Sequence, residues 1–65
     1  QMRINRIKLI ALMAEKDMSI KELVSKTGLS RSTISHIRSG KSCSRETVEI
    51  LIKGLDVPID KVCDN

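Results

Sequence analysis

The segment from residue 28 to residue 40, GLSRSTISHIRSG, concentrates side chains that could form hydrogen bonds or take part in catalysis. Four serines, a threonine, two arginines and the chain's only histidine surround three apolar residues, and no carboxylate occurs between Lys26 and Arg45. A serine–histidine catalytic pair needs a carboxylate to orient the imidazole, and His36 has none nearby in sequence. Ser35 and His36, as helix neighbours, would also point about 100° apart. We therefore predict a binding surface and no enzyme.

The same segment is predicted to form a helix with an apolar seam and a polar face. At about 100° per residue, Ile34 and Ile37 lie side by side, and Leu29 packs just before the helix begins. Serine and threonine compete for backbone hydrogen bonds and are poor choices for an ordinary solvated helix. A face rich in them and flanked by arginines favours close approach to phosphates and base edges. A capped surface helix of unusual composition is the alternative. The polar face and its margins hold Arg31, Ser32, Thr33, Ser35, His36, Arg38 and Ser39.

Composition narrows the class of partner. The 65 residues are enough for one domain near the lower limit for folding on a single core. Without any Phe, Tyr or Trp, the chain lacks the stacking side chains that most single-strand and RNA modules use. Residues 1–41 carry nine Lys/Arg against three Asp/Glu, whereas residues 42–65 carry three against five. This asymmetry favours a polyanion-binding surface, with solubility as the alternative explanation of the net charge of +4.

The two cysteines do not predict a disulfide framework or a metal site. We expect Cys43 and Cys63 to be reduced thiols in a cytoplasmic protein, because the sequence shows no signal peptide and no membrane span. Together with His36 they are the only soft metal ligands, and they lack CxxC or HxxxH spacing. No cofactor, small-molecule ligand or membrane contact is indicated.

Helical periodicity throughout the chain predicts five short helices and no sheet. The first covers about residues 4–16. The next three begin after serine caps at Ser19, Ser30 and Ser44, and glycines at 28 and 40 end the second and third. Pro58 opens a short fifth turn as its first helical residue. The first helix has two apolar stripes, one of Ile4, Ile7, Ala11 and Ala14 and another of Leu9, Leu12 and Met13. The inner stripes of the second and fourth helices are Ile20, Leu23 and Val24, and Val48, Leu51, Ile52 and Leu55.

The sequence ELVSKTGLSRSTISHIRSGKS resembles the helix-turn-helix of phage-repressor, Cro-like or XRE-type DNA-binding domains. VEILIKGLDVPIDKV is similar to the fourth and fifth helices of that family, so the resemblance covers about residues 6–62. It implies an all-α, five-helix, lambda-repressor-like domain over residues 2–65. The helix-turn-helix would occupy about residues 19–40 and the recognition helix about residues 31–39. The match rests on the Leu23–Val24 pair, Gly28, Leu29–Ser30, Ile34, Ile37 and Gly40–Lys41.

The resemblance also implies site residues, with the third helix reading the major groove of double-stranded DNA. Arg31 is suited to base reading because a guanidinium can pair bidentately with guanine O6 and N7. The expected base-reading residues are Arg31, Ser32, Ser35 and His36. The expected phosphate contacts are Thr33, Arg38, Ser39, Lys41, Ser42 and Ser44.

Three features depart from the family pattern. Ile20 stands where a glutamine often begins the second helix. Met13 and Arg38 occupy the positions of a common buried Arg–Glu pair, so we expect Arg38 to be available to DNA or solvent. Asp56 replaces the glycine that usually ends the fourth helix, while Gly54 lies inside that helix.

The implied function is a sequence-specific transcription regulator, a repressor, in a bacterial or phage cytoplasm and associated with the nucleoid. It would bind a palindromic operator as a homodimer. Two alternatives are a helix-turn-helix protein-interaction module, as in an antitoxin or adaptor, and the DNA-binding fragment of a larger regulator. The expected dimer interface is Ile50, Val57, Ile59 and Val62, with the helix-one stripe of Ile7, Ile10 and Ala14 as the alternative.

Overall fold

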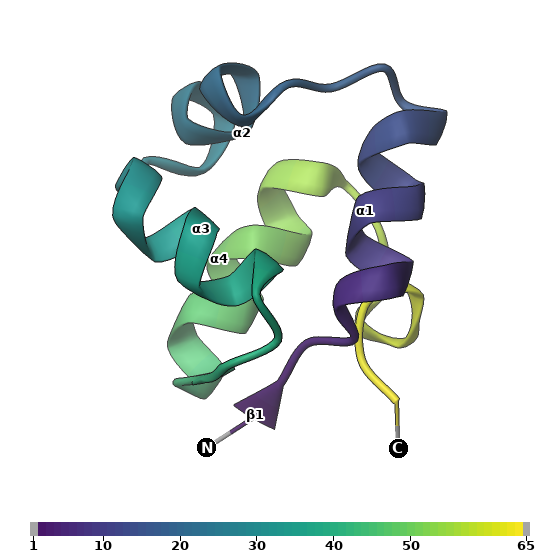
Figure 1. The fold of residues 1–65 in the computed structure, drawn as a ribbon, viewed down its shortest axis with the longest axis vertical. Coiled ribbons are helices and arrows are strands. Elements are labelled where there is room, and N and C mark those ends of the chain that lie inside the picture. The colour runs from purple at the N-terminus through teal and green to yellow at the C-terminus, as the bar shows by residue number, and fades with distance from the viewer. Residues whose placement is uncertain (1, 65) are drawn as a thin grey trace.

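Residues 2–64 form four α-helices, one 3-10 turn and a two-stranded ribbon in a computed structural model (Figure 1). The helices pack around one core, and the predicted all-α class is confirmed. The ribbon pairs the start of the chain with the segment after α3. The helical elements are α1 (Arg6–Glu15), α2 (Ile20–Thr27), α3 (Arg31–Arg38), α4 (Arg45–Leu55) and η1 (Ile59–Lys61), and the strands are β1 (Met2–Arg3) and β2 (Ser42–Cys43).

The predicted helix ends are confirmed for α2, α3 and the start of α4. Ser19, Ser30 and Ser44 each accept a hydrogen bond, 3.1 Å long, from the backbone N–H three residues further on. Such a bond satisfies one of the amides that a helix leaves unpaired at its start. Gly28 and Gly40 take left-handed conformations, with φ of 76° and 88°. Gly28 directly follows α2, and Gly40 follows Ser39, which caps the end of α3. The turn between α2 and α3 is therefore fixed by local chemistry.

The predicted start of the first helix was two residues too early. Asn5 has an extended backbone, and its Oδ1 accepts from the N–H groups of Ile7 and Lys8 at 3.0 and 3.1 Å. This cap places Arg6 at the first helical position. Ile4, counted in the helical stripe, is instead a fully buried residue of the preceding segment.

Two further predictions were wrong. The sequence predicted no sheet, but β1 and β2 pair antiparallel, with Met2 opposite Cys43 and Arg3 opposite Ser42. Strands of two residues are too short to show an alternating pattern. The fifth element is a three-residue 3-10 turn, and Pro58 precedes it with an extended backbone instead of being its first residue.

The core uses only one of the two apolar stripes of α1. Leu9, Leu12 and Met13 are buried, whereas Ile7, Ala11 and Ala14 of the other stripe are exposed, Ile7 to 62%. No polar or charged residue is buried as a whole in the part of the chain described. None of the helices within residues 2–64 is long and apolar enough to cross a membrane. The buried residues are Ile4, Leu9, Leu12, Met13, Leu23, Ile34, Ile37, Val48, Leu51, Leu55, Val62 and Cys63.

The end of α4 explains the third departure noted above, which concerns Asp56 and Gly54. Asp56 adopts the left-handed conformation that a glycine usually supplies, with φ of 58°. Asparagine and aspartate tolerate this conformation better than other residues with a Cβ atom. Gly54 lies where α4 meets the end of α2. A Cβ atom at this position would be only 2.5 Å from Thr27 Cγ2, which is too close for a normal contact. The missing side chain thus allows α2 and α4 to pack closely.

Candidate nucleic-acid interface

The polar face of α3 points out of the molecule. Ile34 and Ile37 are completely buried, as predicted, and hold the helix against α1 and α2. Arg31 is exposed at the start of the helix. The helix is joined to α2 by the short turn over residues 28–30, so α2 and α3 form a helix-turn-helix (Figure 1). The exposed side chains of the polar face are Ser32, Ser35, His36 and Ser39.

The start of α3 is held by two serine–threonine contacts. Ser30 Oγ accepts from the N–H of Thr33 at 3.1 Å and donates to Thr33 Oγ1 at 2.8 Å. Thr33 is half-buried. These bonds fix the first turn of the helix, and they therefore fix the direction in which the side chains of Arg31 and Ser32 project from it.

His36 has a structural contact that sequence analysis missed. Its Nε2 lies 3.2 Å from the carbonyl oxygen of Ser42 in β2. A carbonyl can only accept, so we assign the ring proton to Nε2, which leaves Nδ1 as the acceptor in the neutral ring. The imidazole therefore links the polar face of α3 to the segment after Gly40. No sequence pattern signals a bond to a backbone carbonyl six residues away.

Like Thr33, the predicted phosphate contacts Ser39 and Ser44 use their hydroxyls inside the domain. Ser39 Oγ donates to the carbonyl of His36 at 2.6 Å. Ser44 Oγ accepts from the N–H of Thr47 and lies 2.9 Å from Thr47 Oγ1, as the cap of α4. Lys41 is exposed between them, and Ser42 is half-buried in β2.

Arg38 is less accessible than the sequence indicated. Its side chain is half-buried, and its Nε is buried without a hydrogen-bond partner among the described residues. Met13, at the position of the family's buried arginine, belongs to the core. The stem of Arg38 therefore packs into the domain, and only part of its guanidinium reaches the surface.

The structure brings two further arginines next to the segment after α3, where phosphate contacts were predicted. Arg3 is paired with Ser42 across the ribbon. Arg6 lies against Gly40, since a Cβ atom on that glycine would be 3.4 Å from Arg6 Cδ. Both arginines are exposed. Sequence analysis did not select them, because the ribbon joins residues about forty positions apart and leaves no local signal.

The predicted dimer residues differ in accessibility. Ile50, Val57 and Ile59 are half-buried at the surface. Val62 is fully buried, so its side chain supports the core and offers no contact surface. The alternative stripe on α1 contains the large apolar residues that are most exposed in residues 2–64, Ile7 and Ile10.

Both cysteines are free thiols. Burial raises the pKa of the Cys43 thiol, and the nearby Cys63 raises it further. Burial likewise raises the pKa of Cys63, with a second contribution from Asp64. The thiols are therefore neutral and weakly nucleophilic at neutral pH. Over residues 2–64, no three His, Cys, Asp or Glu side chains are grouped so that they could hold a metal ion.

Comparisons with known proteins agree with this geometry. Residues 8–64 match the family of Cro/C1-type helix-turn-helix DNA-binding domains. The chain is also similar to the crystal structure of the wild-type restriction-modification controller protein C.Esp1396I, with a TM-score of 0.72 and 28% sequence identity, over 82% of this chain and 70% of that one. A comparison with curated protein sequences found no match. The chain therefore belongs to the Cro/C1-type helix-turn-helix family and is a DNA-binding transcription regulator.

Proposed function

We propose that the protein is a sequence-specific repressor that inserts α3 into the major groove of an operator. The observation that carries this proposal is the division of α3 into a fully buried seam, Ile34 and Ile37, and an exposed face of short polar groups. The major groove is wide enough to admit a helix and presents a distinct donor and acceptor pattern for each base pair. A domain bound over a promoter would block the polymerase. The similarity to a restriction-modification controller supports a regulatory role.

The position of each side chain supports a division of roles. Arg31, at the exposed start of α3, is the proposed reader of a guanine. Lys41, exposed after the helix, is a proposed phosphate contact that carries no sequence information. Further proposed base readers are Ser32, Ser35 and His36, and further proposed phosphate contacts are Thr33, Arg38, Ser39, Ser42 and Ser44.

We also propose that two copies bind a palindromic operator. One short helix reads only a few base pairs, and helix-turn-helix dimers extend the site by placing two such helices about 34–36 Å apart. The corner formed by α4 and η1 is the proposed interface, because half-buried Val57 and Ile59 lie there and acidic residues give it a charge that does not attract phosphates.

Selection of bound sequences from random duplex DNA tests the function directly. A repressor of this kind should enrich one palindromic site, and its affinity for that site should fall steeply as salt rises, because bound phosphates release counterions. A reporter promoter carrying the enriched site should then be silenced by the parent protein. Enrichment of no sequence at any salt concentration would contradict the proposal.

The exposed stripe on α1 favours one second candidate function, that of a protein-interaction module such as an antitoxin or adaptor. Ile7 is 62% exposed and Ile10 38%, and apolar surface of this kind is often used for partner contacts. Under this reading, the Arg31→Ala variant would keep the function in cells, whereas Ile7→Asp would lose it. The opposite result favours DNA reading.

A further inference from the structure

The ribbon places Arg3 on the outer surface of the domain, next to the segment that follows α3. Met2 and Cys43 face each other across β1 and β2, and both pack against the core. Side chains alternate along a strand, and directly opposed residues share a face. The next pair, Arg3 and Ser42, therefore points away from the core, in agreement with the exposure of Arg3.

Arg6 reaches the same region from α1. It is the first residue of that helix and is exposed, and its Cδ lies close to Gly40, which follows the cap of α3. Arg3, Arg6 and Gly40 also line one surface hollow. The first two elements thus bring two arginines beside the loop that carries Lys41, although that loop is distant from them in sequence.

These two arginines are not neutralised by ion pairs in the described part of the chain. The two salt bridges found within residues 2–64 join Lys8 to Asp64 and Arg45 to Glu49. Asp64 also borders the hollow, but its carboxylate already binds Lys8 at 2.9 Å and Asn5 at 2.6 Å. The positive charge of Arg3 and Arg6 is therefore available to an external anion.

We propose that Arg3 and Arg6, the arginine pair, bind backbone phosphates of the operator beyond the end of α3. The inference rests on the proposed function. The start of a recognition helix contacts the base edges, and Lys41, in the loop beyond the C-terminal end of α3, is a proposed phosphate contact. Groups beside that loop are therefore expected to meet the DNA backbone and not the base edges. Guanidinium groups bind phosphates bidentately, and such contacts hold the protein in register without reading sequence.

The salt dependence of binding to the selected duplex tests the arginine pair. Each lost phosphate contact should reduce the slope of log affinity against log salt by about 0.9. For the Arg3→Gln/Arg6→Gln variant the slope should fall by about 1.8, so that a fourfold rise in salt weakens the parent roughly twelvefold more than the variant. The preferred sequence should not change. The Arg3→Lys/Arg6→Lys variant should recover most of the slope, because it keeps the charge.

Lys16→Gln is the matched control, because it removes one exposed cation at the opposite end of α1. Should the double variant fail to fold by circular dichroism, Arg3→Gln alone changes only the outer face of the ribbon and should lower the slope by about 0.9. A parent that binds its selected site with an Arg31-dependent preference, while the arginine variants keep the parent's slope, would overturn this inference and leave the proposed function intact. A fall in slope for Lys16→Gln equal to the fall for Arg3→Gln would also overturn it. A parent that selects no duplex would reject both.

Discussion

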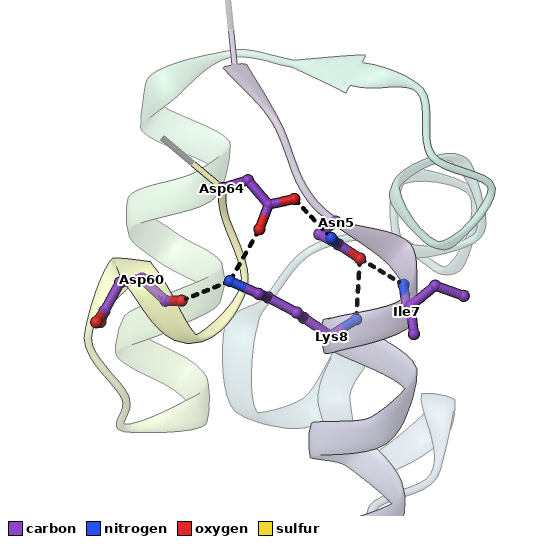
Figure 2. A network of polar contacts seen from close by, with 5 residues as sticks. All are labelled: Asn5, Ile7, Lys8, Asp60 and Asp64. Atoms are coloured by element: carbon purple, nitrogen blue, oxygen red, sulfur yellow. Dashed lines mark hydrogen bonds and ion pairs between the residues drawn. The ribbon is translucent and has the colours of Figure 1, made fainter.

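The ammonium of Lys8 lies 2.9 Å from the carboxylate of Asp64 and fastens the C-terminal segment to the start of α1 (Figure 2). The same lysine donates to the backbone carbonyl of Asp60 at 3.2 Å. Asn5 Nδ2 donates to the other carboxylate oxygen at 2.6 Å, while Asn5 Oδ1 caps α1. One asparagine thus serves both the helix start and the closure of the domain.

This contact predicts a specific loss of stability in acid. The hydrogen bonds from Lys8 and then Asn5 lower the pKa of Asp64 below its ordinary value. A lowered folded-state pKa stabilises the protein fully above the ordinary Asp pKa of about 3.9, and that stabilisation is lost as the pH falls through the folded-state pKa. Asp64→Asn should therefore reduce the free energy of unfolding at pH 7 but not at the acidic end of the titration. Urea unfolding across this range measures the difference.

Asp60→Asn is the matched control for this prediction. It also removes one negative charge near the C-terminus, but Asp60 accepts from Lys8 through its backbone carbonyl and not through its carboxylate. Its unfolding free energy should follow that of the parent at each pH. A constant difference between Asp64→Asn and the parent down to the lowest pH would contradict the assigned ion pair.

The packing of Gly54 against Thr27 predicts that the effect of Gly54→Ala on the free energy of unfolding changes sign when Thr27 is also replaced. Alanine in place of a helical glycine normally stabilises by about 1 kcal/mol. Here the new Cβ would lie 2.5 Å from Thr27 Cγ2. Thr27 cannot rotate freely, because its Oγ1 donates to the carbonyl of Leu23 at 2.7 Å and accepts from the N–H of Leu29 at 3.1 Å. Gly54→Ala should therefore destabilise the parent, by about 1–3 kcal/mol if the clash behaves like overpacking in a core.

Thr27→Ser removes the clashing methyl group and keeps the hydroxyl with both hydrogen bonds. In that background, Gly54→Ala should become stabilising, because only the helix-propensity term remains. Thermal or urea unfolding of the four proteins in the cycle gives the coupling. Equal effects of Gly54→Ala in both backgrounds would show that the two helices do not meet at this point.

Much of this fold could be predicted because the residues that begin and end its helices act locally. A serine three residues ahead of an amide, or a glycine after the last turn, is visible in the sequence itself. Ser30, Gly28 and Gly40 were assigned correctly for this reason. The buried seam of Ile34 and Ile37 followed from the helical period alone.

The contacts that were missed join residues distant in sequence. The Asn5–Asp64 bond spans 59 positions, and although asparagine is a common N-cap residue, nothing local in the sequence links Asn5 to Asp64. The pairing of Arg3 with Ser42 has the same origin. At the candidate site, face and charge were predictable, whereas the link from His36 to the Ser42 carbonyl depends on where the loop returns.

The buried seam of α3 predicts a large difference between two substitutions on the same helix. Ile37 is completely buried, so Ile37→Ala should leave a cavity and cost about 2–5 kcal/mol. A domain of this size has about 3–5 kcal/mol to lose, and the variant should be largely unfolded. Ser35 is exposed, and Ser35→Ala should leave the melting temperature unchanged or slightly higher. Circular dichroism melting distinguishes them, and a well-folded Ile37→Ala protein would mean that the seam is misassigned.

Base reading and phosphate binding should separate in two variants. Arg31→Ala should cost about 1–3 kcal/mol on the selected duplex and relax one base position, because a bidentate contact to a base edge is lost. Lys41→Ala should weaken binding to all duplexes to a similar extent and flatten the salt slope by about one. Fluorescence anisotropy with the selected and a scrambled duplex measures both. If both variants bind the selected duplex as the parent does, α3 and its following loop are not the DNA surface.

Dimer formation should depend on the corner of α4 and η1 and not on α1. Ile59, like Val57 two residues before it, is half-buried, so an aspartate at this position would bring a charge into an interface that closes over it. Sedimentation of the parent with its selected duplex should give two chains per site, and Ile59→Asp should give mainly one, at the same degree of folding by circular dichroism. Ile7→Asp is the matched control, because it places the same charge on the most exposed apolar residue of α1. Loss of the second chain in Ile7→Asp, with the Ile59→Asp complex intact, would move the interface to α1, and a parent complex with a single chain would remove the dimer altogether.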